Sequence, residues 1–158
     1  MRLLGALPKV TLFSFGLVLS SALLIAAEKG LPGSKPGVQL KIGTILASNQ
    51  SQDFDPRLSK MKNQLKVFKY RSYRLINEEI QDVPWQANAL FSIPGGRSLV
   101  VVPQEYRDRQ VSLKVRLLER DKPLLDTSVR LRNRGNLLLG GPVHEGGVLI
   151  LSIWAMAE

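Results

Sequence analysis

The chain contains no cysteine, and this absence excludes several kinds of chemistry. Without thiols there is no disulfide framework, no thiolate metal site and no cysteine nucleophile. Histidine is almost as scarce: His144 is the single one, in a glycine-flanked segment where only Glu145 is an acidic neighbour in sequence. Because a metal or catalytic histidine needs partners close by, the sequence predicts no metal, no cofactor and no catalytic residue.

Aromatic residues are also few, at 6% of the chain, and some of them lie close together between Phe68 and Ile80. There Tyr70 and Tyr73 alternate with lysine and arginine, a pattern that can bind single-stranded nucleic acid through stacking and phosphate contacts. A strand that buries its rings and extends its cations into solvent explains the same residues. We therefore predict a strand here, and we expect no nucleic acid as partner.

Positive charge is abundant, because 22 lysine and arginine residues face 13 acidic ones and give a formal charge of +9. Such an excess points to polyanions, acidic lipid headgroups or an acidic protein as partners. The alternative is that the charge only keeps a small exported domain soluble. With 44% hydrophobic residues, the composition is otherwise that of a globular protein.

The N-terminal residues 1–27 have the order of a secretory signal. Arg2 and Lys9 precede an uncharged, mostly apolar run from Val10 to Ala27. An 18-residue helix is about 27 Å long, close to the hydrocarbon thickness of a membrane, so an uncleaved inner-membrane anchor is the alternative to a cleaved signal. Either way, the sequence predicts an exported protein of the periplasm or cell envelope.

Residues 28–37 (EKGLPGSKPG) contain two prolines and three glycines and predict a linker. One globular domain is then expected over residues 38–158. Cleavage after Ala27 removes Arg2 and Lys9 and leaves 20 basic and 13 acidic residues, a charge of +7. The predicted domain therefore stays basic without its N-terminal segment.

One amphipathic helix is predicted near residues 56–68. Asp55 can cap its first turn, and Pro56 suits the first helical position. Apolar side chains then recur at gaps of three, four and three and form one stripe, and they are Leu58, Met61, Leu65 and Phe68. The stripe can bind a membrane surface or a partner, or it can pack across a sheet face, and packing is the simpler interpretation.

The remaining segments predict about eight strands and turns between them. Strands are expected near residues 38–47, 68–80, 85–93, 99–102, 111–117, 125–132, 137–139 and 148–156. Gln104 to Arg109 is predicted as a loop, and Gly140-Gly141-Pro142 as a strand break. The last run is almost continuously apolar, which predicts a strand covered on both faces. The expected fold is α+β: a mostly antiparallel sheet or sandwich with one helix, preceded by the N-terminal apolar helix.

Residues 110–132 carry the feature of greatest functional interest. Apolar residues alternate with polar ones along both strands of this hairpin, so one side is predicted to be core. If the strands pair as their turn implies, four cations share the outward side, and they are Lys114, Arg116, Arg130 and Arg132. Since opposed like charges repel, we expect Asp126, Glu119 or an anionic ligand to compensate them.

The segment Thr127 to Pro142 (TSVRLRNRGNLLLGGP) resembles the C-terminal strands of bacterial outer-membrane secretins. The similarity consists of a strand, a glycine-containing turn and a short apolar strand that ends in Gly-Gly, and it covers about a tenth of the chain. It implies a role in envelope assembly and not a pore. The long secretin body with its repeated periplasmic domains is absent, and no functional residue is carried over.

Two functions fit these observations. The first is a non-enzymatic envelope module that binds a partner protein or an anionic lipid or polymer surface through Lys114, Arg116, Arg130 and Arg132. The second is a small secreted hydrolase of an acidic polymer, whose carboxylates come together only on folding; the candidates are Glu105, Asp108 and Glu145. Convergence of two such carboxylates in a cleft, about 5–10 Å apart, separates the two functions.

Overall fold

The computed structural model describes residues 36–158. The predicted N-terminal apolar segment (residues 1–27) and almost all of the predicted linker lie outside these residues. Within residues 36–158, no helix combines the length and the apolar character that crossing a membrane requires. The strands begin at Gly37, next to the predicted domain start at residue 38.

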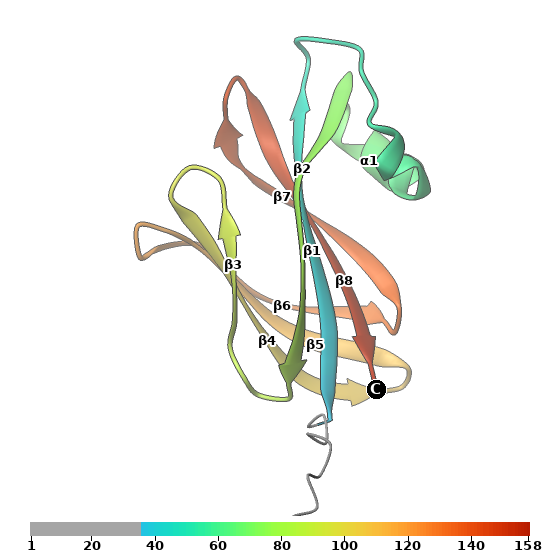
Figure 1. The fold of residues 1–158 in the computed structure, drawn as a ribbon, viewed down its shortest axis with the longest axis vertical. Coiled ribbons are helices and arrows are strands. Elements are labelled where there is room, and N and C mark those ends of the chain that lie inside the picture. Colours follow the sequence, from blue (N-terminus) through green and yellow to red (C-terminus); the bar gives the residue numbers. More distant parts are fainter. Residues whose placement is uncertain (1–35) are drawn as a thin grey trace, which may run out of the picture. The chain divides into compact units, whose positions relative to one another are not determined.

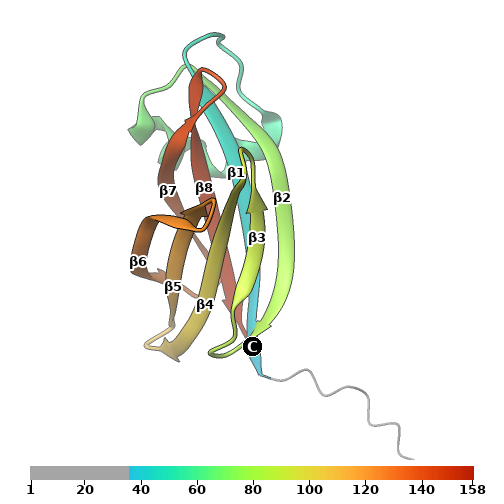
Figure 2. The same cartoon turned by 90° about the vertical axis from the view of Figure 1, so that its left-hand side faces the viewer.

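Eight strands form two four-stranded antiparallel sheets that face each other as a sandwich (Figures 1 and 2). The first sheet has the order β2-β1-β8-β7 and consists of β1 (Gly37–Ser48), β2 (Ser72–Pro84), β7 (Gly135–His144) and β8 (Gly147–Ala157). The second has the order β3-β4-β5-β6 and consists of β3 (Ala89–Ile93), β4 (Arg97–Arg107), β5 (Gln110–Glu119) and β6 (Lys122–Arg132). The prediction of about eight mostly antiparallel strands is confirmed.

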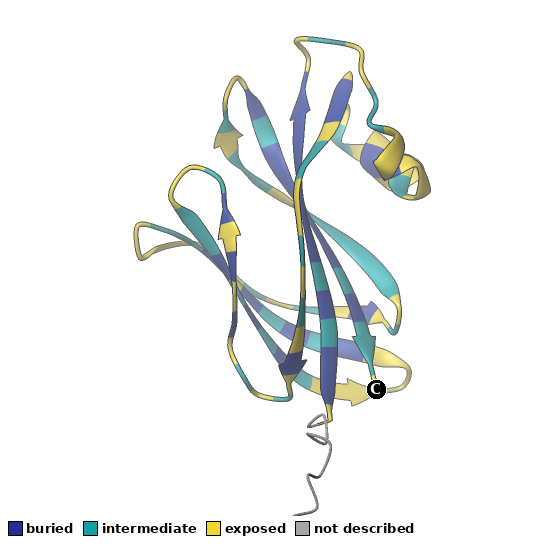
Figure 3. Cartoon of the chain, viewed as in Figure 1, coloured by how far each residue is buried: buried dark blue, intermediate teal, exposed yellow. Residues whose placement is uncertain are grey.

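The core lies between the two sheets, and side-chain alternation explains how it forms. Successive residues of a strand point to opposite faces, so every second apolar residue of each strand reaches the interior. On β5 the inward residues are almost completely buried, while their neighbours are half-buried or exposed (Figure 3); the inward set is Val111, Leu113, Val115 and Leu117. The same alternation leaves the other side of β5 and β6 free for polar side chains.

Strand β8 is covered on both faces, as its continuous apolar run predicts. It lies between β1 and β7 in the first sheet. Leu149, Leu151 and Ile153 point into the core between the sheets. Ile150 points to the other side and belongs to a second apolar cluster beneath the helical segment.

The helical segment consists of a 3-10 turn (Pro56–Met61), the α-helical turn α1 (Lys62–Leu65) and a second 3-10 turn (Lys66–Phe68). Its apolar stripe packs on the outer side of the first sheet, where Leu58 and Leu65 are buried. The predicted position and buried stripe are confirmed, but only one turn is α-helical. The Leu65 carbonyl accepts a hydrogen bond from the Tyr73 hydroxyl (2.7 Å), and the Lys69 amide donates to Lys66 instead, which closes a 3-10 turn.

The predicted loop from Gln104 to Arg109 was wrong, because β4 continues to Arg107. A bulge between Pro103 and Glu105 interrupts the alternation of apolar and polar residues, so the sequence pattern does not read as a strand. The chain turns only at Asp108 and Arg109, both of which have positive φ angles.

The predicted strand break at Gly140-Gly141-Pro142 was also wrong, since β7 runs to His144. The three residues form a bulge against β8, with a register shift between Gly140 and Val143. A Cβ atom at Gly141 would lie 2.8 Å from the Leu149 carbonyl oxygen, so glycine permits the close approach of the two strands. Here glycine shapes a continuous strand instead of ending it.

Candidate functional site

Strands β5 and β6 bring the four predicted cations to one outward side of the second sheet. In the pairing of the two strands, Lys114 lies opposite Ser128 and Arg116 opposite Asp126. Arg130 and Arg132 extend the same side, opposite Ser112 and Gln110. We call these four residues, Lys114, Arg116, Arg130 and Arg132, the basic face.

A bulge in the hairpin makes this arrangement possible. Near the turn, Leu118 pairs with Pro123, but the next pair is Leu117 with Leu125, so the register shifts by one residue. Because a one-residue shift reverses which side of the sheet each side chain takes, the unshifted register would turn Arg130 and Arg132 towards the core. The bulge therefore places the cations of both strands on the same surface.

The charges on the basic face are only partly compensated. Arg116 forms an ion pair with Asp126, with 3.0 Å between Nη2 and Oδ2. Arg130 lies 3.9 Å from a carboxylate oxygen of Glu105 on β4. The predicted repulsion between directly opposed cations does not occur, because each cation faces a neutral or acidic residue across the ladder.

Lys114 and Arg132 have no carboxylate within ion-pairing distance among residues 36–158. Glu119, one of the predicted compensating residues, instead binds Arg97 at the other end of β5, at 2.8 Å. Two cations on a sheet face are thus free to bind an anion from solution.

A hollow of about 380 Å³ lies on the basic face beside Arg130. Its wall includes hydroxyl and amide groups from three strands or their connections, among them Ser112, Ser128 and Gln104. A guanidinium group and neutral donors together suit the oxygens of a carboxylate, sulfate or phosphate, since arginine presents its N–H groups as a planar fork. Glu105 also lines this hollow and offsets part of the Arg130 charge.

The carboxylates of the alternative hydrolase do not all converge. Glu105 and Asp108 line a common hollow of about 290 Å³, whereas Glu145 lies in the turn between β7 and β8 and contacts His144. Glu105 and Asp108 each lie within 4 Å of an arginine, Arg130 and Arg107 respectively.

His144 ends strand β7, and its side chain is only 16% exposed, so it is not the exposed loop residue that its glycine-flanked position indicates. Its one charged contact is Glu145, at 3.6 Å. Among residues 36–158, no three histidine, aspartate or glutamate side chains come together as a metal-binding group.

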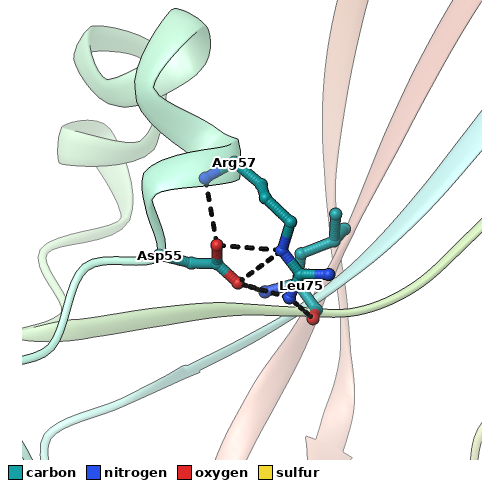
Figure 4. A network of polar contacts seen from close by, with 3 residues as sticks. All are labelled: Asp55, Arg57 and Leu75. Atoms are coloured by element: carbon teal, nitrogen blue, oxygen red, sulfur yellow. Dashed lines mark hydrogen bonds and ion pairs between the residues drawn. The ribbon is translucent and has the colours of Figure 1, made fainter.

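A further hollow, of about 540 Å³, opens near the start of β2 and includes Asp53, Asp55 and Arg74 in its wall. The Asp55 carboxylate in this hollow already accepts hydrogen bonds from other residues of the chain (Figure 4). Its carboxylate accepts hydrogen bonds from the backbone amides of Arg57 (3.0 Å) and Leu75 (3.1 Å) and from the Arg57 guanidinium (2.7 Å). The hydrogen bond from the Arg57 side chain is the main reason why the pKa of Asp55 lies well below its usual range.

Replacing Asp55 with asparagine is expected to lower the melting temperature at pH 7 by about 5 °C, because the neutral amide has one acceptor oxygen and cannot replace the charge-assisted hydrogen bonds from Arg57 and Leu75 together. A lowered folded-state pKa contributes stability that is present above the unfolded-state pKa of about 3.9 and is lost as the pH falls towards the folded-state value. The difference between the two proteins should therefore shrink between pH 5 and pH 2 in thermal scans. An undiminished difference at pH 2 would contradict this role of the carboxylate.

A scan against protein-family models found no match, and searches of curated proteins and of solved structures found no significant match. The resemblance of Thr127 to Pro142 to secretins therefore stays a prediction.

Sequence reasoning missed three arginines that extend the basic face at one end of the sandwich. Arg107 and Arg109 belong to the β4–β5 turn region, and Arg134 to the β6–β7 turn. The sequence could have indicated that these arginines lie together, because alternate turns of an antiparallel meander lie at the same end of a sheet. The wrong loop assignment for residues 104–109 concealed it.

Proposed function

We propose that the chain is a non-enzymatic, exported or membrane-tethered module of a bacterial cell envelope that binds an anionic partner through the basic face. The observation that carries the proposal is the pair of uncompensated cations, Lys114 and Arg132, on the outward side of a paired β hairpin. The paired strands hold these charges at fixed spacing, so the backbone loses little conformational entropy when an anion binds. The partner chemistry that fits is an array of phosphate, sulfate or carboxylate groups.

The polarity of the two sheet sides supports binding over catalysis. The inward residues of β5 serve the core, while the outward ones are long cations with hydroxyl neighbours. The bulge between Leu117 and Leu118 brings the cations of β6 to the same surface, and solubility alone does not need this alignment.

To test the proposal, Lys114, Arg116, Arg130 and Arg132 are replaced together with glutamine, and binding to soluble polyanions such as heparin and polyglutamate is titrated at low and raised salt. We expect an affinity loss of about thirtyfold at low salt, because each unpaired cation near an anionic array contributes about 1 kcal/mol and two of the four cations, Lys114 and Arg132, are unpaired. The salt dependence should also become weaker, since fewer counterions are released.

The matched control makes the same change in charge on the exposed side of the helical segment and replaces Lys60, Lys62, Lys66 and Lys69 with glutamine. Its affinity should fall far less. If both variants lost the same affinity, net charge alone would explain the effect, and the basic face would not be a specific binding site.

A further inference from the structure

A second group of cations lies at one end of the sandwich, where two turns meet. The backbone amide of Asn133, in the β6–β7 turn, donates a hydrogen bond to the carbonyl of Arg109 in the β4–β5 turn (2.9 Å). The arginines of both turns therefore share one end of the molecule. We call this group the end surface; it consists of Tyr106, Arg107, Arg109, Arg132 and Arg134.

The end surface lies where the described domain begins. Arg134 donates its backbone amide to Ala155 (2.8 Å), and Glu158 donates its own to Gly37 (3.3 Å). Figures 1 and 2 show the C-terminal residue next to the first residues of β1, at the same end as the β4–β5 turn. Gly37, the last residue of the predicted linker, thus lies at the same end of the sandwich as these arginines.

Two of the arginines occupy turn positions with an unusual backbone conformation. Arg109 and Arg134 have φ angles of 60° and 62°, in the left-handed region that favours glycine or asparagine. Arg120 in the β5–β6 turn shares this conformation, with a φ angle of 48°, so the backbone alone assigns the two arginines no role, and the case for the end surface rests on its charge and its hollow.

The charges of the end surface are largely unpaired. Within residues 36–158, no carboxylate lies within ion-pairing distance of Arg109, Arg132 or Arg134. Arg107 contacts only Asp108, at 3.7 Å, and both side chains are strongly exposed. Asp108, which lines the same end of the sandwich, offsets one of the four arginine charges, so an excess of positive charge remains.

A hollow of about 630 Å³ connects the two turns. Its wall includes Arg109 and Arg132, together with Tyr106, which is 48% exposed. Arginine forks bind phosphate oxygens, and a tyrosine ring with its polar hydroxyl is typical of the boundary between lipid headgroups and acyl chains. This combination fits a phospholipid headgroup better than a smooth acidic protein surface.

We propose that the end surface binds the anionic phospholipid headgroups of the membrane that the N-terminal segment enters. The inference rests on the membrane-tethered form of the proposed function, in which the N-terminal segment stays uncleaved, and it assigns the end surface a partner of its own. A ten-residue linker spans at most about 35 Å, so the tether holds the end surface within reach of the membrane and raises its effective concentration there. Basic residues next to a membrane segment are attracted by the negative surface potential of anionic lipids.

The absence of cysteine allows a direct test, because one introduced cysteine can carry a fluorophore. Gln110, exposed at the end surface, is replaced with cysteine in the full chain, which is reconstituted into vesicles whose lipid headgroups carry a nitroxide quencher. Ser92, exposed near the β3–β4 turn at the opposite end, gives the matched position. We expect strong quenching at position 110 with anionic lipid, weak quenching with zwitterionic lipid or high salt, and little quenching at position 92.

The double variant Arg109→Asn and Arg134→Asn removes two charges and keeps residues that tolerate a positive φ. Loss of these two cations should lower the equilibrium constant for membrane contact about thirtyfold. The control is Arg120→Asn, which changes an arginine with a φ of 48° in the β5–β6 turn, at the opposite end, and should have no effect. The proposal is overturned if quenching is equal at positions 110 and 92. It is also overturned if quenching does not depend on anionic lipid, or if the double variant is quenched as strongly as the unchanged chain.

The two proposals can fail separately. If the end surface does not contact lipid but the quadruple glutamine variant still loses its affinity for soluble polyanions, the basic face binds another partner, such as an acidic protein. If position 110 is quenched while the triple variant Lys114→Gln, Arg116→Gln and Arg130→Gln binds polyanions normally, the membrane contact stands without the basic face.

Discussion

Replacing Phe91 with alanine is expected to lower the free energy of unfolding by about 3–5 kcal/mol. Phe91 is 1% exposed and belongs to the cluster that fills the space between the two sheets. Because β3 is an edge strand of only five residues, few other side chains fix it to the core. The loss is a large part of the total stability of a domain of this size, about 5–15 kcal/mol. Urea unfolding followed by tryptophan fluorescence measures it.

Leu90 provides the control for this prediction. It is adjacent to Phe91 on the same strand, but it points outwards and is 62% exposed. Replacing Leu90 with alanine should change the free energy of unfolding by no more than about 0.5 kcal/mol. Similar losses in the two variants would mean that β3 does not keep the register that pairs Phe91 with Leu99.

Strands with uninterrupted alternation could be predicted from the sequence, because the period of two is a direct consequence of backbone geometry. The inward residues from Val111 to Leu117 show this, and so does the two-sided burial of β8. Where a bulge shifts the period, prediction failed. Gln104 to Arg109 was assigned to a loop and Gly140-Gly141-Pro142 to a strand break, although β4 continues to Arg107 and β7 to His144 through bulges.

The same limit applies to the candidate site. Alternation was sufficient to place Lys114, Arg116, Arg130 and Arg132 on the outward side of their strands. The residue opposite each cation depends on the register, which the bulge at Leu117 sets and the alternation does not encode. For this reason the pairing of Arg116 with Asp126 was one of several expected compensations, and the contact of Arg130 with Glu105 was not foreseen.

Replacing Leu65 with alanine should lower the free energy of unfolding by about 2–5 kcal/mol. Leu65 is completely buried between the helical segment and the outer side of the first sheet, in the cluster that contains Ile45 and Ile150. Its carbonyl also accepts the hydrogen bond from the Tyr73 hydroxyl at the end of α1. A cavity at this position loosens the contact between the segment and β2, and urea unfolding should report a lower midpoint.

A substitution at Val67 tests whether the helical segment only packs on the sheet or also binds a membrane or a partner. It lies two residues from Leu65 but is 76% exposed. If packing is the role of the segment, replacing Val67 with alanine should leave both stability and vesicle binding almost unchanged, because the side chain is already in water. A Val67 variant that keeps its stability and loses vesicle binding would instead assign the segment a binding role. The buried stripe of Leu58 and Leu65 favours the first result, since apolar side chains that already fill a core are not free to enter a lipid surface.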